Sequence, residues 1–319
     1  MKTKKSIALL TVLCSLVLFL GFNPAESAAA AKQKYEEKFE KTVAISKDGK
    51  VDLRNISGDI EVKTWDKAEV KIDALKVSKA STLEKAKENA QKVTIEVNKE
   101  DGILRISTKY AKTKTKSLSV SVRYNLMIPA KASVKVKSIS GDITLEKIGG
   151  KAEASTVSGN VDVIKADKGV KCSSVSGNVG AKNVLGDADL STVSGNISLE
   201  QIRGSVEAES VSGNVKLIDV SEADVVKGKA LSGTVIYEGK IKSSGSYLLK
   251  SHSGKVEMRI PSDSAFDFEA KTFSGSIHSD FEITISGKIS KREIRGSVNG
   301  GGADITLKNF SGNIYLKKK

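Results

Sequence analysis

The chain has 319 residues, a formal net charge of +14 and two cysteines, Cys14 and Cys172. Cys14 lies in an apolar N-terminal segment, so the rest of the chain has no second cysteine for an intramolecular disulfide, and packing must stabilise it. Aromatic residues make up 5% of the chain, which argues against a protein that binds single-stranded nucleic acid by stacking bases on rings.

Residues 1–31 have the three parts of an export signal. A basic start precedes an apolar run from about Ile7 to Phe22 and then small residues, so cleavage is expected between Ser27 and Ala31. An uncleaved membrane anchor is the alternative, because the run approaches the length that spans a membrane. Contact with a membrane is expected only through such an uncleaved signal.

The positive charge would persist after cleavage. Removal of residues 1–31 takes away three lysines and one glutamate, and lowers the net charge from +14 to +12. Outside the cell, the anionic partners at hand are cell-wall polymers, acidic glycans and membrane surfaces, rather than nucleic acid. Solubility alone is the alternative explanation.

An irregular segment interrupts the chain before its regular part. Ser81 and Glu84 have the spacing of a capping box, which predicts a short helix there. Pro129 would end the last of the strands that follow. These strands are expected at residues 93–97, 103–107 and 118–128. Residues 73–135 are therefore interpreted as a helix-plus-strands insertion or N-terminal cap within a single domain, residues 32–319.

A Ser-Gly pair then returns every 18 residues. A half-period of nine lies inside this spacing, because Gly204 stands midway between two of the repeated glycines. The spacing later loosens to 20 and 21 residues, and Gly296 and Gly312 complete the series. The regular glycines are Gly141, Gly159, Gly177, Gly195 and Gly213.

Each nine-residue half ends in apolar residues two apart, which is the period of a strand, after a glycine that marks a turn. Val161 and Val163 are expected to point inward and Asp162 outward. Two halves make one coil, so the sequence predicts an all-β fold. It is a parallel β-solenoid of flattened two-sheet coils of about 18–21 residues, with an inserted small α+β cap segment.

The repeated "VSGN" predicts a structural ladder along the stacked turns. The valine is expected to fill the corner, the glycine to make the turn, and the asparagine amides to hydrogen-bond from coil to coil. A ligand surface formed by the same serines and asparagines is the alternative. The predicted asparagine ladder is Asn160, Asn178, Asn196 and Asn214. The closing "YLKKK" is expected to protect the final strand from pairing with another copy.

No pattern of catalytic, cofactor-binding or metal-ligating residues is found. Acidic residues are scattered among lysines at outward positions, and the Asp that a calcium-binding β-roll needs after its glycines is absent from most turns. His252 and His278 lack a partner at zinc spacing and are interpreted as surface residues. Cys172 is expected to be a buried small hydrophobe. Trp65 is read as a core or cap residue, with an exposed carbohydrate-stacking platform as the alternative.

Three stretches resemble a bacterial β-strand-repeat family labelled "putative adhesin", a domain of unknown function. They are "ISGDIEVKTWDKAEVKIDA" (56–74), "YNLMIPAKASVKVKSISGDITL" (124–145) and "VNGGGADITLKNFSGNIYL" (298–316). The resemblance covers roughly residues 40–317. It implies a secreted or envelope-associated β-solenoid, and it implies no catalytic residues that could be transferred.

We therefore expect a secreted or cell-envelope protein without enzymatic activity, acting as a scaffold or adhesin-like binder. Its partner would be an anionic cell-wall polymer or an envelope protein, met through an extended basic surface. Two alternatives remain open. One is a polysaccharide-active β-helix enzyme, which would need clustered inward-facing carboxylates, and the other is a solenoid that polymerises end to end.

Overall fold

Each 18-residue repeat forms two strands that face each other across a thin apolar core. On one side Ala152 and Ala154 point inward, and on the other Val161 and Val163 do so, while Asp162 is exposed. The predicted inward and outward positions are confirmed here. Many thin apolar layers, one in each coil, stabilise the fold. Each buried Val, Leu or Ile contributes about 1.5–3 kcal/mol to the free energy of folding relative to an exposed side chain.

The computed structural model describes residues 32–111, 118–286 and 290–319, and the predicted export signal in residues 1–31 lies outside this range. Among the described residues, no helix is long and apolar enough to cross a membrane.

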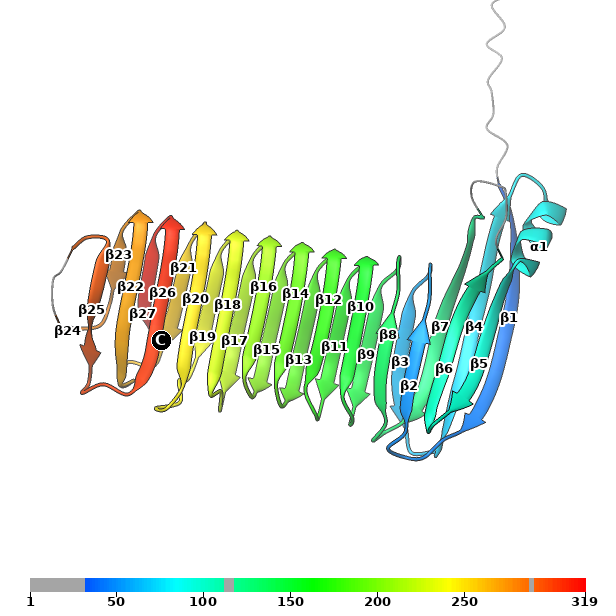
Figure 1. Ribbon diagram of the computed structural model, residues 1–319, viewed down its shortest axis with the longest axis horizontal. Helices are drawn as coiled ribbons and strands as arrows, with labels where there is room; N and C mark the ends of the chain where they lie inside the picture. The colour runs from blue at the N-terminus through cyan, green and yellow to red at the C-terminus, as the bar shows by residue number, and fades with distance from the viewer. Residues whose placement is uncertain (1–31, 112–117, 287–289) are drawn as a thin grey trace, which may run out of the picture. The chain divides into compact units, whose positions relative to one another are not determined.

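Successive coils pair in parallel, with a register offset of one repeat: Val161 faces Val179, and Ala152 faces Val170. Figure 1 shows the strands stacked side by side in two layers. One layer, called sheet A, contains β3 (Ile60–Trp65), β9 (Ile143–Ile148), β11 (Val161–Ala166), β13 (Val179–Leu185), β15 (Ile197–Arg203), β17 (Val215–Ser221), β19 (Val235–Gly239) and β21 (Val256–Ile260). The other, sheet B, contains β2 (Lys50–Arg54), β8 (Ser133–Lys137), β10 (Ala152–Ser158), β12 (Val170–Ser176), β14 (Ala188–Ser194), β16 (Val206–Ser212), β18 (Val225–Ser232) and β20 (Ser246–Ser253). The predicted parallel β-solenoid is confirmed.

Several strands of sheet A contain a left-handed non-glycine residue that the sequence pattern does not predict. In strands β9, β11, β13, β15 and β17, one non-glycine residue each has a left-handed backbone conformation, a region that such residues rarely occupy. This residue adds one extra outward position and returns the next side chain to the core, so Ala166, after Lys165, is buried. The residues are Lys147, Lys165, Asn183, Gln201 and Asp219, with φ between 54° and 66°.

The N-terminal end of the two sheets is built from the irregular segment and the strand before it. β6 (Ile103–Tyr110) runs parallel to β2, and β7 (Val120–Pro129) runs parallel to β3, so both continue the coil layers. β1 (Gln33–Ala44), β4 (Glu69–Ala80) and β5 (Val93–Glu100) then add antiparallel strands at the edges.

The single helix of the described chain, α1 (Leu83–Gln91), packs Ala86 and Ala90 toward the strands. Its N-cap is Thr82, whose hydroxyl accepts a hydrogen bond from the backbone N–H of Lys85. The expected cap at Ser81 was therefore wrong by one residue.

The C-terminal coils are not stacked in chain order. β26 (Ala303–Ser311) and β27 (Ile314–Lys318) lie between β20–β21 and the coil formed by β22 (Phe266–Ser274) and β23 (Ile277–Ser279), as the red strands of Figure 1 show. The expected final strand is thus an interior one, and its lysines do not guard an edge. Gly296 was wrongly counted as a turn glycine, because it lies in the antiparallel strand β25 (Glu293–Val298), which pairs with β22 and with β24 (Thr284–Ile285).

Candidate binding edge and groove

The repeated turns lie in register along one side of the coils. We call this surface the turn edge. It consists of residues 139–142, 157–160, 175–178, 193–196, 211–214, 231–234, 252–255, 310–313 and 273–276. Backbone hydrogen bonds join each turn to the next, as in the donation from the Gly177 N–H to the Ser194 carbonyl at 3.0 Å.

The predicted glycines occupy positions where adjacent turns approach closely. Gly159, Gly177 and Gly213 have positive φ values of 141°, 151° and 153°. A Cβ atom on Gly177 would fall deep inside contact distance of the Gly159 carbonyl oxygen, and one on Gly195 would do the same to Gly177. A side chain at these positions would push the coils apart.

The predicted asparagines form a continuous chain of hydrogen bonds. Asn160 Oδ1 accepts from the backbone N–H of Asn178, and Asn178 Oδ1 accepts from that of Asn196, both at 2.9 Å. Asn196 and Asn214 continue the pattern as far as Thr234. These side chains bond mainly to the next backbone N–H, rather than amide to amide.

The valine of "VSGN" does not fill the corner, so that expectation was wrong. Val193 is 48% exposed, whereas the residue before it, Thr192, is buried. The Thr192 hydroxyl donates to the Gly177 carbonyl oxygen at 2.9 Å, and Ser174 and Ser210 make the same bond in their own coils. The interior of the corner is therefore closed by a hydroxyl, and the valine lies outside.

The outward side chains form an apolar column that ends in stacked rings. Its aliphatic part is Ile139, Val157, Val175, Val193, Val211 and Leu231. On the last three coils His252 and Phe310 stack with ring centroids 4.6 Å apart, and Phe310 and Phe273 stack at 4.8 Å. The predicted surface position of His252 is confirmed, but the ring stack was not predicted.

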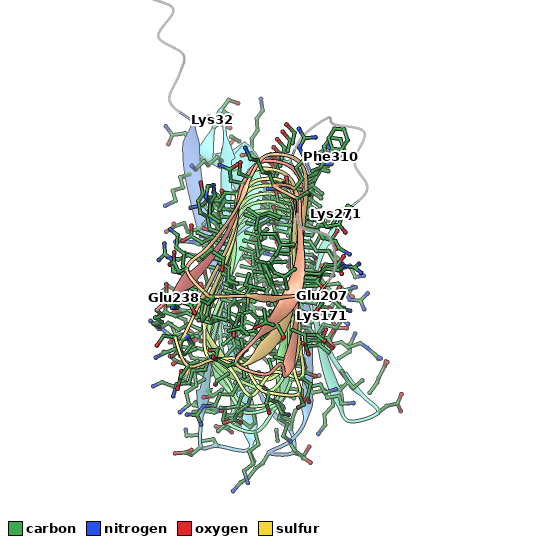
Figure 2. All side chains as sticks on the ribbon, turned by 90° about the vertical axis from the view of Figure 1, so that its left-hand side faces the viewer. Lys32, Lys171, Glu207, Glu238, Lys271 and Phe310 are labelled. Atoms are coloured by element: carbon green, nitrogen blue, oxygen red, sulfur yellow. The ribbon has the colours of Figure 1, made fainter. Side chains whose placement is uncertain are left out.

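A column of four lysines runs beside the rings on sheet B, and we call it the lysine column. It consists of Lys229, Lys250, Lys308 and Lys271, which face one another on adjacent strands. Adjacent strands are about 4.8 Å apart, and like charges at directly opposed positions are destabilising. Figure 2 shows Lys271 and Phe310 on the same side of the coils, with Glu238 on the opposite side.

The two outer lysines of the column have ion-pair partners. Lys229 lies 3.3 Å from Glu207, and Lys271 lies 3.5 Å from Glu293. Lys250 and Lys308, in the middle, form no ion pair with the residues that the structure describes. The centre of the column therefore carries uncompensated positive charge.

A groove of about 490 Å³ lies between the lysine column and the rings. Its lining includes Lys250, Ser251, His252, Lys271, Thr272, Phe273, Ser290, Arg292, Glu293, Lys308, Asn309 and Phe310. Ser251, Asn309 and Thr272 lie between the lysines and the rings along the strands, but their side chains are buried and point into the corner of the coil, away from the groove. Four cationic side chains and one carboxylate line it, so it is suited to an anion.

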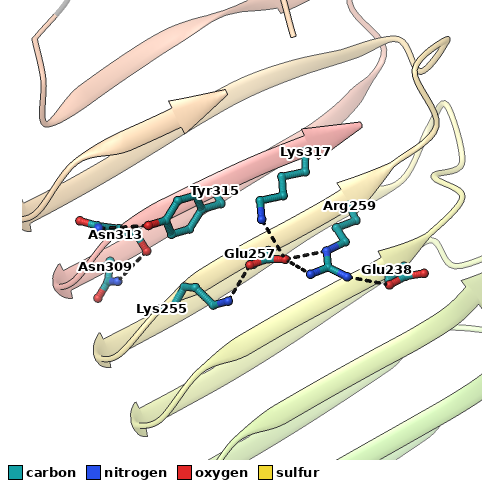
Figure 3. A network of polar contacts seen from close by, with 8 residues as sticks. All are labelled: Glu238, Lys255, Glu257, Arg259, Asn309, Asn313, Tyr315 and Lys317. Carbon is teal, nitrogen blue, oxygen red and sulfur yellow. Dashed lines mark hydrogen bonds and ion pairs between the residues drawn. The ribbon is translucent and has the colours of Figure 1, made fainter. Parts of the chain in front are cut away.

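The opposite sheet carries an ion network around Glu257, shown in Figure 3. The carboxylate is 1% exposed and accepts from Lys255 Nζ at 2.7 Å and from Arg259 Nε at 2.6 Å. Burial alone would raise the pKa of Glu257, but the hydrogen bonds from these two cations outweigh it and hold the pKa below its usual value. Such a group stays ionised, so it is not suited to act as a general acid.

The remaining candidates lie apart from the groove. Cys172 is buried, and burial raises the pKa of its thiol to about 12. His278 is exposed and stacks on Tyr315. Trp65 is half-buried, and its indole N–H donates to the Glu69 carbonyl oxygen at 2.7 Å. Within residues 32–111, 118–286 and 290–319, no three His, Cys, Asp or Glu side chains gather in a way that could hold a metal ion.

These features define a parallel β-solenoid with a repeated turn edge and one cationic groove. The model of the Toastrack DUF4097 family matches residues 49–317, and the chain belongs to this family. The resemblance found in the sequence is thereby confirmed.

Solved structures that match the chain come from bacteria. One is a "putative adhesin" from Parabacteroides distasonis ATCC 8503, 11% identical, with 89% of this chain and 97% of that chain covered and a TM-score of 0.48. A second is a "putative adhesin" from Bacteroides fragilis NCTC 9343, which is 13% identical. The match covers 88% of this chain and 97% of that chain, with a TM-score of 0.41. A third is a "putative lipid binding protein" from Parabacteroides distasonis ATCC 8503, which is 14% identical. The match covers 88% of this chain and 97% of that chain, with a TM-score of 0.44. No curated protein matches the chain.

Proposed function

We propose that this protein is an exported, non-enzymatic, adhesin-like component of the cell envelope that binds an anionic wall polymer. The observation that carries the proposal is the lysine column, in which Lys250 and Lys308 face each other without an ion-pair partner among the described residues. An anionic chain that crosses the column would replace repulsion between lysines by attraction.

The solenoid supports this role because it offers long, regular faces. A polymer that meets several weak contacts in register gains avidity beyond that of any single contact. The adhesin names of similar structures agree with a binding role, and the net charge of about +12 expected after export favours an anionic partner.

A polysaccharide-active enzyme is the weaker alternative. It would need clustered inward-facing carboxylates with one raised pKa. Among the described residues, the one buried carboxylate is Glu257, and its pKa is lowered by surrounding cations. Partial burial and the neighbouring Asp142 raise the pKa of Asp162, but this side chain is exposed on the outer face rather than directed inward.

End-to-end polymerisation is also less well supported. The edge strand β1 of sheet A carries exposed charged residues along most of its length. Charges on an edge strand oppose pairing with a second copy.

Sedimentation with isolated bacterial cell wall tests the proposal, using the chain from residue 32 onward in a salt series. We expect binding that fades as salt rises, because salt screens exposed charges. The double variant Lys250→Glu/Lys308→Glu should bind at least ~10-fold more weakly at low salt, a loss of about 1.4 kcal/mol.

The matched control is Lys165→Glu/Lys216→Glu, which reverses two exposed lysines of sheet A. It makes the same change in net charge away from the column. If both double variants lose the same amount of cell-wall binding, net charge alone explains the loss, and the lysine column is not the binding surface. No binding at low salt would rule out a wall polymer as the partner.

A further inference from the structure

Large apolar side chains gather on the turn edge. Thirteen of them are exposed among the described residues, and eight of the thirteen belong to this edge. In the order of the coils, the eight are Ile139, Val157, Val175, Val193, Val211, Leu231, Phe310 and Phe273. Exposed apolar side chains that are scattered singly need no explanation, whereas a contiguous row of them is typical of an interaction surface.

The row changes in two respects at its C-terminal end. On β10, β12 and β14 the edge residue is a valine, and the residue two positions before it is a serine. On β20, β26 and β22 the edge residue is a ring, and the residue two positions before it is a lysine. Thr192 and Thr272 make the same corner bond in a valine coil and in a ring coil, so the corner requires neither change. The surface where both changes occur is called the ring patch, and it consists of His252, Phe310, Phe273, Lys250, Lys308 and Lys271.

The rings are the outermost part of the ring patch. Phe273 is 64% exposed and Phe310 is 47% exposed. Figure 2 shows Phe310 near the upper end of the coils and Lys271 below it on the same side. The groove of about 490 Å³ separates the rings from the lysines. A broad surface that approaches the turn edge would therefore meet the rings first and the lysines beside them.

We propose that the ring patch binds the surface of an anionic lipid bilayer: the rings enter the boundary between headgroups and acyl chains, and the lysines contact lipid phosphates. Apolar side chains of surface-bound segments are buried about 5–10 Å into this boundary, and neighbouring basic side chains are attracted to anionic headgroups. Lys250 and Lys308, without an ion-pair partner among the described residues, supply uncompensated charge. The proposal goes beyond the proposed function, which uses the lysines alone, and this membrane contact does not depend on an uncleaved signal.

The combination of rings and lysines favours an anionic bilayer over other partners. A second copy of the chain would cover the rings but would add a second set of lysines to the same surface. A neutral bilayer would take up the rings and leave the lysine repulsion unrelieved. A wall polymer that lies along the lysine column would leave the rings in water. An anionic bilayer offers apolar volume and negative charge side by side, so it accommodates both.

Sedimentation with lipid vesicles tests the proposal on the chain from residue 32 onward. The probes are vesicles of phosphatidylcholine alone and vesicles of equal parts phosphatidylcholine and phosphatidylglycerol. We expect binding to the anionic vesicles that is at least ~10-fold tighter than binding to the neutral ones. Phe273→Ser/Phe310→Ser should weaken binding to the anionic vesicles at least ~10-fold, and it should leave sedimentation with cell wall unchanged.

The matched control is Val157→Ser/Val175→Ser, which removes two exposed apolar side chains of the same row where the residue two positions earlier is a serine. Thermal unfolding checks that both double variants are folded. The control should bind anionic vesicles as the wild type does. If both double variants lose the same amount of vesicle binding, or if the ring variant loses none, the ring patch is not the lipid contact.

Phe273→Trp gives a second readout that does not depend on comparing affinities. The only tryptophan of the wild type is Trp65, which lies in β3 of sheet A, so the wild type supplies the background. An indole ring is favoured at the boundary between lipid and water. We expect the fluorescence to shift to shorter wavelength on anionic vesicles and to be quenched by lipids with brominated acyl chains. Vesicle binding without either change would show that the rings stay in water, and it would overturn the proposal.

The lipid contact and the proposed function fail in different ways. Wall sedimentation that depends on Lys250 and Lys308, together with no binding to anionic vesicles, would overturn the lipid contact and leave the proposed function standing. Vesicle binding that depends on Phe273 and Phe310, together with no wall sedimentation, would support the lipid contact and overturn the wall polymer as a partner.

Discussion

Asn178 Oδ1 accepts a hydrogen bond from the backbone N–H of Asn196, one coil further along the chain, at 2.9 Å. The same oxygen is 3.3 Å from Asn196 Nδ2. Because the backbone bond is shorter, the essential property of the ladder residue is a side-chain acceptor. Asp142 meets this requirement at the start of the regular coils, where its Oδ1 accepts from the Asn160 N–H at 2.7 Å.

Asn196→Ala should lower the free energy of unfolding by about 1 kcal/mol, because the exposed N–H of Asn214 loses its acceptor. Asn196→Asp should recover more than half of this loss, because a carboxylate also accepts. Urea denaturation of both variants measures the difference. An Asn196→Asp variant as unstable as Asn196→Ala would show that the Nδ2 contacts matter more than the acceptor.

Gly177→Ala should be far more destabilising, by about 3–5 kcal/mol, because it combines a positive φ with a collision against the Gly159 carbonyl oxygen. Gly102→Ala separates the two effects, because Gly102 has a φ of 73° but open space around it. It should cost only about 1–2 kcal/mol. Similar thermal unfolding temperatures for the two variants would mean that coil-to-coil approach is unimportant.

The alternation of side chains could be predicted from the sequence only where the backbone stays regular. Leu190 and Thr192 point inward, so Val193 must point outward, although its nine-residue counterpart, Ile202, is buried. Ile202 follows Gln201, whose left-handed conformation shifts the alternation by one residue. The two halves of the repeat therefore match in residue type without matching in environment.

The stacking order of the last coils could not be predicted, because every coil edge presents nearly the same backbone pattern. A return through residues 299–302 allows β26 to reach the β20 edge, and β25 occupies the far side of β22. The lysine column and the groove depend on this order. The sequence does contain a signal for them, since "KSHSG" (250–254), "KNFSG" (308–312) and "KTFSG" (271–275) share a lysine two residues before a ring.

Cys172 should not react with thiol reagents in the folded protein at pH 8, because burial raises its pKa to about 12 and almost no thiolate is present. Reaction should require unfolding, so its rate should follow the denaturant dependence of the unfolded fraction. The raised pKa also means that this thiol contributes stability below its unfolded pKa, about 8.5. That contribution is lost as pH rises toward 12. Rapid labelling without denaturant would show that the coil interior opens locally.

Glu257→Gln should lower the free energy of unfolding by about 1–2 kcal/mol at pH 7, because Lys255, Arg259 and Lys317 lose their shared counter-charge. The folded-state pKa of Glu257 is lowered, so its contribution is complete above the ordinary value of 4.5 and disappears as pH falls through the folded pKa. The stability gap between wild type and variant should therefore narrow in acid. Glu61→Gln, which disrupts an exposed pair with Lys63, is the control and should change stability by less than about 0.5 kcal/mol. A gap for Glu257→Gln that stays constant from pH 7 to pH 3 would show that packing around the side chain, rather than its charge, stabilises this face of sheet A.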